Sequence, residues 1–390
     1  MQLTMTEKEM LEGKHGKAAR KSMEILVTLG EIYGAERMVE VGSVQVAGVS
    51  YANLGEPGLE FLAEMAEDGR ARVLTTLNPA GMDLENWRNL GIDPNFAKNQ
   101  ERVITAFQKM GIVTTCTCTP YLVGNLPLFN EHVAWSESSA VCFANSVIGA
   151  KTNREGGPSA LAAALTGRTP LYGLHLDENR HAQIRVDVKA HIHGTNDYGT
   201  LGKAIGDRIG DKIPYITGLK NPSLDELKAL CASMATYGGT ALFHIEGVTP
   251  NRTNIPSETT EVTPPDMEKA EKELNDETTI DFVGIGCPHA SIHEIKRIAE
   301  LLKGKKVKKE VWIATARPTK QMADRMGYTA TIEASGAKFA CDTCFAVAPL
   351  KGRFKSLATD SAKGCFYGRG TNKFSVKHCA LEECIAEAVG

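Results

Sequence analysis

The sequence predicts an α/β protein in which several sub-domains with mainly parallel sheets surround a central cleft. Short apolar runs of strand-like composition alternate with segments whose apolar residues recur at helical spacing. Turn residues such as Pro, Gly and Asn follow many of the strand-like runs. With 390 residues the chain is long enough for two or three domains. We expect three α/β sub-domains, at residues 1–135, 136–265 and 266–390, the last with an irregular C-terminal part.

The first sub-domain begins with two predicted helices in residues 5–33, the second of which spans Ala18–Ile32. The elements predicted after them are, in order, strands Met38–Val41 and Val44–Val49, helix Gly58–Glu67, strand Ala71–Leu77, helix Asn95–Met110 and strand Ile112–Thr115. The strand that ends at Leu77 is closed by Asn-Pro-Ala-Gly, a turn signature.

The alternation continues through the other two sub-domains. The second is predicted to contain helices Ser138–Ala150 and Ser159–Leu165, strand Gln183–His193, helices Tyr198–Arg208 and Leu224–Thr236, and strand Ala241–Ile245. Residues Pro250–Pro265 are rich in Thr, Pro and Asn and are the best candidate for a linker. The third is predicted to contain helix Met267–Leu274, strand Phe282–Ile285, helix Ile292–Leu302, strand Val311–Ala314 and a final helix Lys377–Val389. The chain after residue 330 reads as otherwise irregular, with strand pieces and many Gly and Lys.

Composition excludes several classes of partner. The net charge is −3, with 44 basic and 47 acidic residues well interspersed, so neither nucleic acid nor a membrane surface is expected as a partner. No apolar run reaches the ~18 residues of a membrane span. The amphipathic, acidic N-terminus does not read as a signal peptide. We therefore expect the ten cysteines to face a reducing cytoplasm, where roles as ligands or reactive groups are commoner than disulfides.

Five of the cysteines lie in unusual local settings. They are found in Thr-Thr-Cys-Thr-Cys-Thr-Pro (114–120), Gly-Ile-Gly-Cys-Pro-His (284–289) and Ala-Cys-Asp-Thr-Cys-Phe (340–345). The first two segments end an apolar, strand-like run and are closely followed by Pro, which favours a turn into a helix. Positive charge at a helix N-terminus stabilises a thiolate. Four of the other cysteines lie in helix-like patterns and are expected to be small buried hydrophobes: Cys142, Cys231, Cys379 and Cys384.

Thiolates in loops that follow strands suit an iron–sulfur cluster. The carboxyl ends of parallel strands converge on one crevice, so three such loops from three sub-domains could meet there. Three protein ligands would leave one iron of a [4Fe-4S] cluster open as a Lewis acid. The Cys341/Cys344 pair also fits a redox pair or half of a zinc site. His191 and His193 alternate as metal ligands do, but no Cys or acidic partner completes that set.

At this point the sequence resembles a known family, aconitase X, and in particular its large subunit. The segments that carry the resemblance run almost end to end and in the family's order: Gly48–Asn53, Thr76–Pro79, Cys118–Tyr121, Trp135–Ala140, Asn145–Gly157, Gly286–His289, Asp342–Cys344 and Ser361–Gly364. The motif Glu-Ser-Ser-Ala followed by Asn-Ser-Val-x-Gly-Ala-x-Thr-Asn-Arg-Glu-Gly is specific to this family rather than generic.

The resemblance implies an aconitase-like fold and a dehydratase that removes water from a hydroxy acid with the help of an iron–sulfur cluster. Some members are fused single chains that act on cis-3-hydroxy-L-proline. Archaeal split members dehydrate (R)-5-phosphomevalonate to trans-anhydromevalonate 5-phosphate in a mevalonate pathway. The resemblance to a large subunit implies that the swivelling fourth domain is a separate small subunit, which supplies a serine as the proton-abstracting base.

The resemblance also implies a set of site residues. Cys118, Cys287 and Cys344 would ligate the cluster, with Cys341 as the alternative to Cys344. The cluster is expected as [4Fe-4S], with [3Fe-4S] or [2Fe-2S] forms after iron is lost from the isolated protein. The residues expected to bind the phosphorylated hydroxy acid are Gly48, Val49, Ser50, Asn78, Pro79, Glu137, Ser138, Arg154 and Lys363. Backbone N–H groups of the small-residue turn at 48–50 could cradle an anion, and Arg and Lys side chains suit a carboxylate or phosphate.

Two alternatives remain open at this stage. The substrate could be another hydroxy acid, such as cis-3-hydroxy-L-proline, and phosphate selectivity distinguishes the two. The same thiolates could instead form a zinc-binding scaffold without enzymatic activity. Metal analysis separates that case, because zinc is colourless whereas iron–sulfide charge transfer absorbs near roughly 400 nm.

Overall fold

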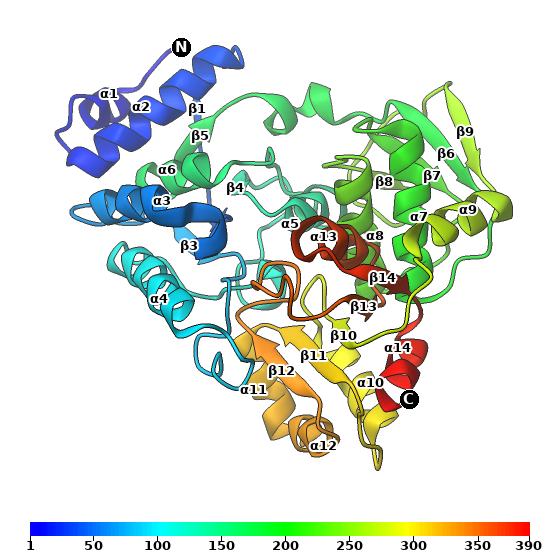
Figure 1. Ribbon diagram of the computed structural model, residues 1–390. Helices are drawn as coiled ribbons and strands as arrows, with labels where there is room; N and C mark the ends of the chain where they lie inside the picture. The colour runs from blue at the N-terminus through cyan, green and yellow to red at the C-terminus, as the bar shows by residue number, and fades with distance from the viewer.

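The computed structural model describes residues 1–390 and contains three separate parallel sheets (Figure 1). The first, ordered β3-β2-β4, comprises β2 (Ser43–Val46), β3 (Leu74–Leu77) and β4 (Val133–Trp135). The second, ordered β8-β7-β6-β9, comprises β6 (Ile184–Val188), β7 (Pro214–Thr217), β8 (His244–Ile245) and β9 (Thr259–Val262). The third, ordered β12-β11-β10-β13-β14, comprises β10 (Phe282–Ile285), β11 (Glu310–Thr315), β12 (Lys338–Cys341), β13 (Ser356–Thr359) and β14 (Ser375–His378).

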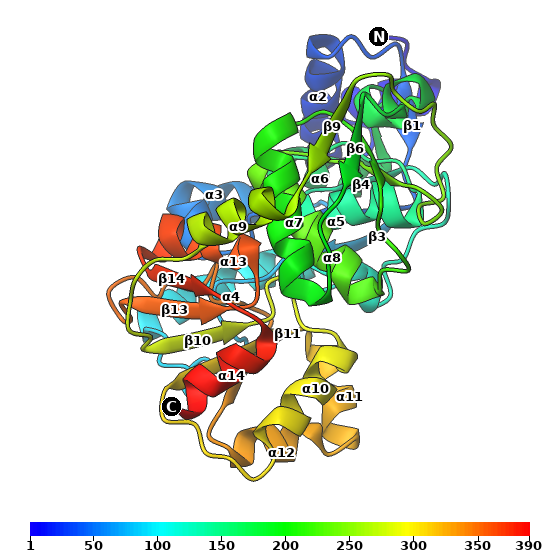
Figure 2. The same cartoon turned by 90° about the vertical axis from the view of Figure 1, so that its right-hand side faces the viewer.

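All pairings in these three sheets are parallel, so the predicted α/β class with mainly parallel sheets is confirmed. One small antiparallel pair stands apart, formed by β1 (Met38–Glu40) and β5 (Arg168–Pro170). In Figure 1 the first sheet lies at the left, the second at the upper right and the third at the bottom. The two termini lie at opposite ends of the molecule in both views (Figures 1 and 2).

Helices cover each sheet. Those with most of their contacts in the first part are α1 (Met5–Leu11), α2 (Lys17–Ile32), α3 (Tyr51–Met65), α4 (Pro94–Lys109) and α6 (Gly157–Thr166). Those around the second sheet are α5 (Ser138–Phe143), α7 (Gly194–Ile209), α8 (Leu224–Tyr237) and α9 (Pro264–Leu274). Those around the third are α10 (Ile292–Leu302), α11 (Arg317–Arg325), α12 (Tyr328–Ala334), α13 (Ala362–Tyr367) and α14 (Leu381–Val389). No helix contains an apolar stretch of the length that a membrane span requires.

Local sequence explains where helices begin. Asp93 precedes α4 and accepts hydrogen bonds from the N–H groups of Asn95 and Phe96, while Pro94 occupies the first helical position. Ser291 caps α10 in the same way, because its hydroxyl accepts from the N–H of Glu294. Each cap satisfies backbone N–H groups in the first turn of its helix and so helps to fix where the helix begins.

Four large buried apolar clusters, and a fifth small one around α1 and α2, hold the molecule together. One lies under the first sheet, one under the second, and one on each face of the third. The cluster that contains Cys287 and Cys344 also contains Met82 and Trp87 of the first part. The first and third parts therefore share a core, and the carboxyl ends of their strands can meet.

The structure corrects the expectation that the chain after residue 330 is irregular. This region supplies three strands of the largest sheet, β12, β13 and β14, and two short helices between and after them. The final helix is α14 alone, since residues 375–378 form β14 rather than the start of a helix. Each strand is only four residues long, and such short runs carry little periodicity for a sequence to reveal.

Three further expectations change in detail. The candidate linker at 250–265 contains β9, an edge strand of the second sheet. Residues 112–115 form only an isolated bridge through Val113. Helix α3 begins at Tyr51, with a kink at Gly55, rather than at residue 58. The sub-domain boundaries at 135 and 265 stay predictions; the three sheets span 43–135, 184–262 and 282–378, and α6 packs against β2.

Candidate active site

Most of the predicted site residues lie in loops at the carboxyl ends of parallel strands, whereas Cys118 follows only the isolated bridge at Val113 and not the predicted strand. The segment 48–50 follows β2, the Asn78–Pro79 turn follows β3, and Glu137 follows β4. In the third sheet, Cys287 follows β10, Cys344 follows β12 and Lys363 follows β13. The crevice rule for parallel sheets therefore holds. The three cysteine loops come from the first and third parts only, and not from three sub-domains as expected.

Cys118, Cys287 and Cys344 come together in the interior. All three are buried, and Cys287 is a near neighbour of both Cys118 and Cys344. The sulfur of Cys118 accepts a hydrogen bond from the N–H of His289, two residues after Cys287, at 3.2 Å. Burial and the nearby Glu137 carboxylate raise the pKa of Cys118 to about 12. Contact with Cys344, and then burial, also raise the pKa of Cys287. A metal would therefore have to displace protons from these two thiols.

Cys116 and Cys341 lie in a different environment. Both are buried beside Arg317 and Asp342, and Cys341 belongs to the apolar cluster on the opposite face of the third sheet from Cys344. Arg317 donates to the carboxylates of Asp83 and Asp342 at 2.5 Å each. The structure therefore groups Cys344, rather than Cys341, with Cys118 and Cys287.

Glu137 and Lys363 form a buried ion pair beside the thiols. Lys363 Nζ donates to Glu137 Oε1, and it also donates to the hydroxyl of Ser139 at 2.6 Å. The Glu137 carboxylate accepts from the N–H of Ala140 at 2.7 Å and so caps α5, and it accepts from the hydroxyl of Ser138 at 3.4 Å. Burial alone would raise the pKa of Glu137, but Lys363 and the N–H groups outweigh it and hold the pKa below its ordinary value. The pair is therefore charged.

The two turns predicted to bind substrate are held together by Gln100 of α4. Its Oε1 accepts from the N–H groups of Tyr51 and Gly81 at 3.0 Å each, and its Nε2 donates to the carbonyl of Val49 at 3.0 Å. Gly48 has a φ of 79°, which only glycine adopts without strain. Gln100 is completely buried. It therefore fixes the 48–50 turn against the turn that begins at Asn78 and Pro79.

Three of the ten buried side-chain atoms without a hydrogen-bond partner lie in these same loops. They are Ser50 Oγ, Asn78 Oδ1 and Thr343 Oγ1. The N–H of Ala80 donates to the carbonyl of Asp342 at 2.8 Å, which places the Asn78 turn beside Thr343. Unsatisfied buried polar groups are rare in proteins. These three atoms would be available to a polar ligand.

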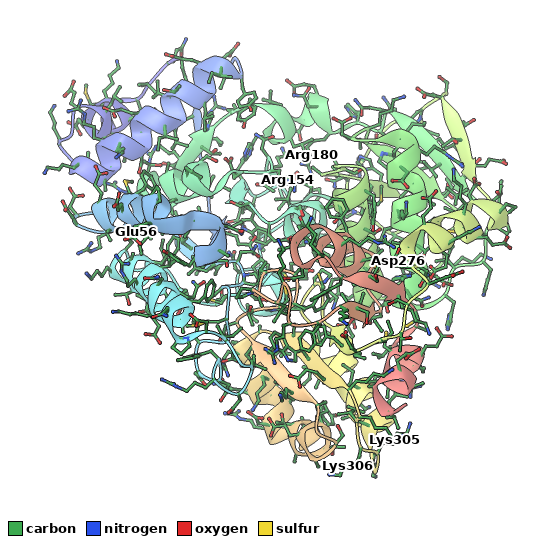
Figure 3. The ribbon with its side chains drawn as sticks, viewed as in Figure 1. Glu56, Arg154, Arg180, Asp276, Lys305 and Lys306 are labelled. Atoms are coloured by element: carbon green, nitrogen blue, oxygen red, sulfur yellow. The ribbon has the colours of Figure 1, made fainter.

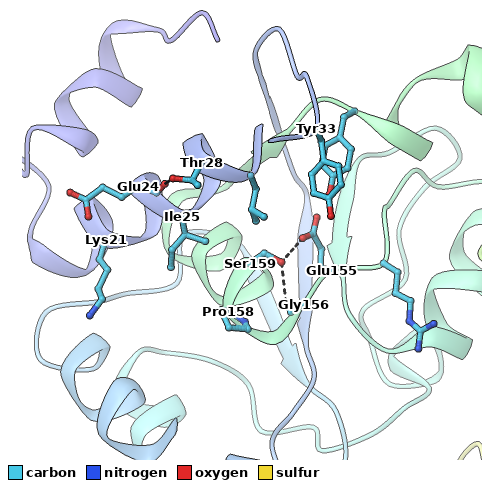
Figure 4. Close-up of a pocket in the computed structure, with 12 residues that line it drawn as sticks. Lys21, Glu24, Ile25, Thr28, Tyr33, Glu155, Gly156, Pro158 and Ser159 are labelled. Atoms are coloured by element: carbon cyan, nitrogen blue, oxygen red, sulfur yellow. Dashed lines mark hydrogen bonds between the residues drawn. The ribbon is translucent and has the colours of Figure 1, made fainter. Parts of the chain in front are cut away.

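Arg154 lies apart from this group. Its side chain is exposed and lines a cavity of about 620 Å³ between α2 and the loop before α6. Figure 3 shows it above α5 in the view. The same cavity is bordered by Ser159, whose hydroxyl donates to Glu155 at 2.6 Å (Figure 4). This cavity, although large, contains none of the three cysteines, so the site is identified by its donor groups rather than by its volume.

The other cysteines and histidines singled out in the sequence remain outside the site. Cys142 and Cys231 are buried in α5 and α8. Cys379 and Cys384 are buried, with their sulfur atoms 3.3 Å apart. His191 and His193 are exposed.

The donor set fits an iron–sulfur cluster. The thiol of Cys287 lies near those of Cys118 and Cys344 and near the ammonium group of Lys363, and the buried Cys365 belongs to the same apolar cluster as Cys287 and Cys344. No three His, Cys, Asp or Glu side chains lie close enough together to hold a single metal ion. In a cluster each thiolate binds a different iron atom, so the ligands need not share one coordination sphere.

Sequence reasoning missed several residues that build the site. Gln100 reads as an ordinary polar position in an amphipathic helix, and Arg317 with Asp83 reads as surface charge. Thr343 lies in the Asp-Thr-Cys segment that carries part of the family resemblance, so its place near the site could be predicted. That its hydroxyl has no hydrogen-bond partner could not. His289 was not missed, because its place after the Cys287-Pro288 turn predicts either a residue that supports the cysteine ligands or a helix cap.

Comparisons with known proteins match the whole chain. Profiles described as Aconitase X first, second and third domain match residues 1–178, 182–278 and 280–390. The chain is 49% identical over 375 residues to the phosphomevalonate dehydratase large subunit of Methanothermobacter thermautotrophicus, covering 94% of each chain. It is 47% identical to that of Methanocaldococcus jannaschii, covering 99% of each.

More distant relatives and a solved structure extend this comparison. The cis-3-hydroxy-L-proline dehydratase of Pseudomonas aeruginosa is 35% identical over 98% of this chain and 69% of its own length. The crystal structure of Thermococcus kodakaraensis aconitase X in its holo form superimposes with a TM-score of 0.93, at 47% identity and with 100% of both chains covered.

Proposed function

The chain belongs to the aconitase X family, and we propose that it is the large subunit of a hydro-lyase that dehydrates (R)-5-phosphomevalonate to trans-anhydromevalonate 5-phosphate. The observation that carries this proposal is similarity over nearly the whole chain to relatives named phosphomevalonate dehydratase large subunit, at 44–49% identity for four of them. The relatives named cis-3-hydroxy-L-proline dehydratase are 34–35% identical. The ten free cysteines support a reducing compartment, which we take to be the cytoplasm.

We assign Cys118, Cys287 and Cys344 as the ligands of a [4Fe-4S] cluster. Such a cluster, when bound by three thiolates, supplies an open iron as a Lewis acid for the substrate hydroxyl. The support for this assignment is the burial of the three thiols, the proximity of Cys287 to both of the others, and the position of Cys287 and Cys344 after strands β10 and β12. A zinc scaffold without activity is disfavoured by the relatives, which are named dehydratases.

The polar residues around the thiols would bind and orient the substrate. Backbone N–H groups of the 48–50 turn and the free hydroxyl of Ser50 suit a phosphate or carboxylate oxygen. Asn78 Oδ1 would accept from a substrate hydroxyl. Lys363 supplies positive charge, and Glu137 with Ser138 and Ser139 holds its ammonium group in place. Arg154 stays a candidate for the distal end of the substrate.

The proton-abstracting base is assigned to a small subunit, as the name "large subunit" of the relatives supports. A base must come within hydrogen-bond reach of the carbon-bound proton. A mobile partner could bring it there on closure and exclude water.

Substrate selectivity tests this proposal. The chain and its small subunit are combined without oxygen and assayed with (R)-5-phosphomevalonate, unphosphorylated mevalonate and cis-3-hydroxy-L-proline. We expect kcat/KM for the phosphorylated acid to exceed that for the other two by at least about 100-fold, because a site built for a polar group strongly rejects analogues that lack it. Preferential turnover of cis-3-hydroxy-L-proline would contradict the proposed substrate but keep the hydro-lyase class.

A further inference from the structure

His289 contacts all three loops that carry the clustered cysteines. It lies two residues after Cys287 and is completely buried. Its N–H donates to the sulfur of Cys118 at 3.2 Å. Its ring nitrogens lie 2.9 Å from the hydroxyl of Thr117, next to Cys118, and 2.9 Å from the carbonyl of Thr343, next to Cys344. One side chain therefore links segments that are 172 and 54 residues away in the sequence.

These contacts fix the tautomer of the ring. The carbonyl of Thr343 can only accept a hydrogen bond, so Nε2 of His289 carries the hydrogen. Nδ1 then has a free lone pair and accepts from the hydroxyl of Thr117. The neutral ring satisfies both contacts, and its orientation is set by one donor and one acceptor on opposite sides.

Side chains from other parts of the chain also bind the backbone of residues 287–289. Lys228 of α8 donates to the carbonyl of His289 at 3.2 Å, and its ammonium group also pairs with Glu294 and with Asp225. The hydroxyl of Ser361 donates to the carbonyl of Cys287. The segment 287–289 is therefore tied to the second part of the chain and to the loop that leads to Lys363.

Helix capping does not account for His289. The cap of α10 is Ser291, whose hydroxyl accepts from the N–H of Glu294 at 3.2 Å. The ring of His289 points instead to Thr117 and Thr343, which belong to the other two cysteine loops.

We propose that His289 is a positioning residue that sets the three thiols of Cys118, Cys287 and Cys344 at the separation needed to hold one iron–sulfur cluster. This inference rests on the cluster assignment of the proposed function. Groups that orient metal ligands from behind are worth about 10- to 100-fold in metal affinity or activity. His289 acts on the ligands of all three loops at once, so its loss should affect retention of the cluster more than the stability of the fold.

The test compares variants of the chain in complex with its small subunit, reconstituted with iron and sulfide without oxygen. The variants are His289→Ala, His289→Gln, which keeps a donor near the position of Nε2, and Thr117→Val, which removes the hydroxyl that binds Nδ1. His293→Ala is the matched control, because His293 lies exposed in the adjacent helix. The measurements are iron and sulfide per chain, the visible and paramagnetic resonance spectra, the rate of iron loss to a chelator and the melting temperature.

We expect His289→Ala to lose iron about 10- to 100-fold faster than the unchanged complex and to show an altered spectrum. His289→Gln should recover part of this loss, Thr117→Val should show an intermediate effect, and His293→Ala should show none. A purely structural role for His289 would lower the melting temperature and leave the spectrum and the rate of iron loss of the folded protein unchanged.

The outcomes that overturn the inference are distinct from those that overturn the function. His289→Ala with unchanged spectrum and iron loss contradicts it. If His289→Ala does not fold, the rate of iron loss from Thr117→Val tests the inference instead. An unchanged rate in that variant contradicts the proposed role of His289. If the complex without substitutions holds its cluster but does not dehydrate 5-phosphomevalonate, only the proposed substrate is wrong. If that complex never takes up iron, both the proposed function and the role of His289 are wrong.

Discussion

Ser50 illustrates what a single buried atom of the proposed site could contribute to binding. Its hydroxyl is buried and has no hydrogen-bond partner, and neither has Oδ1 of Asn78. An unsatisfied buried polar group costs about 1–3 kcal/mol. In the proposed site a bound substrate would act as the hydrogen-bond partner of both atoms, so binding would offset this cost.

Substitution of Ser50 by alanine should therefore separate binding from stability. We expect kcat/KM for 5-phosphomevalonate to fall by about 10- to 100-fold, because a hydrogen bond to a charged group contributes about 1.5–3 kcal/mol. The free energy of unfolding should stay the same or rise slightly, since no protein contact is lost. The matched control is Ser22→Ala, which removes another buried hydroxyl without a partner from α2. Equal activity in the two variants would remove Ser50 from the site.

Unlike Ser50, the Lys363–Glu137 pair should affect both the stability of the fold and the activity when it is broken. Replacing Lys363 by methionine leaves the Glu137 carboxylate buried without its main partner, so we expect the free energy of unfolding to fall by about 3–5 kcal/mol. Dehydration should fall by at least about 100-fold, as expected when a charge that orients the reacting substrate is lost. Denaturant unfolding and steady-state kinetics measure the two effects.

The double variant Lys363→Met, Glu137→Leu distinguishes the two roles. It removes both buried charges, so most of the lost stability should return while activity stays low. Recovery of activity together with stability would show that the pair supports only the fold.

At the scale of residues, the sequence predicted which side chains belong to the candidate site but not which of them contact one another. Cys118, Cys287, Cys344, Glu137 and Lys363 stand in recognisable motifs. The contact between Glu137 and Lys363 joins positions 226 residues apart, and no local pattern encodes it. Free hydroxyls and the triple contact of Gln100 are visible only once the loops are folded together.

At the scale of elements, helix α4 supports the two predicted substrate turns through the side chain of Gln100. The substitution Gln100→Leu leaves two N–H groups and one carbonyl of the substrate turns without partners. We expect the free energy of unfolding to fall by about 3 kcal/mol. KM for 5-phosphomevalonate should rise about tenfold, equivalent to about 1.4 kcal/mol of binding. Steady-state kinetics test this, and an unchanged KM in a destabilised variant would limit Gln100 to a structural role.

The short helix η3 (Gly173–His175) should make stability depend on pH. Burial, and then the neighbouring His132, lower the pKa of His175 to about 3. In the unfolded chain the pKa of histidine is about 6.5, so below that value the unfolded state binds a proton that the folded state does not. The stabilising contribution is therefore complete above pH 6.5 and is lost as the pH falls towards 3.

The variant His175→Gln measures this contribution. Between about pH 6 and 4, the free energy of unfolding of the unchanged chain should fall more steeply than that of the variant, by up to about 1.4 kcal/mol per pH unit. His181→Gln is the control, because His181 is exposed. Parallel curves for the unchanged chain and His175→Gln would contradict the assignment.

Element prediction succeeded where periodicity was strong. Strand Phe282–Ile285 and helix Ile292–Leu302 have the bounds that the sequence predicts. It failed after residue 330, where four-residue strands of the third sheet gain their stability from parallel neighbours rather than from their own pattern. The pairing of β1 with β5 was likewise invisible, because the two strands are three residues long and far apart in the sequence.

At the scale of the whole molecule, two of the three sheets build the proposed site. The first and third parts share an apolar core and contribute the cysteines, the substrate turns and Lys363. The second part supports them, for example through Lys228, which donates to the carbonyl of His289. The sequence predicted parallel sheets whose strand ends converge, but not this division of roles, which depends on how the sheets pack.

The central claim is that this chain carries an iron–sulfur cluster and dehydrates 5-phosphomevalonate only together with a small subunit. The most direct measurement is made without oxygen on the chain, the small subunit and the pair, each reconstituted with iron and sulfide. Iron content, visible absorption and dehydration of 5-phosphomevalonate are measured for all three. We predict an absorbing cluster on this chain and dehydration only by the pair. A colourless chain that binds zinc and no iron, or full activity of the chain alone, would contradict the account.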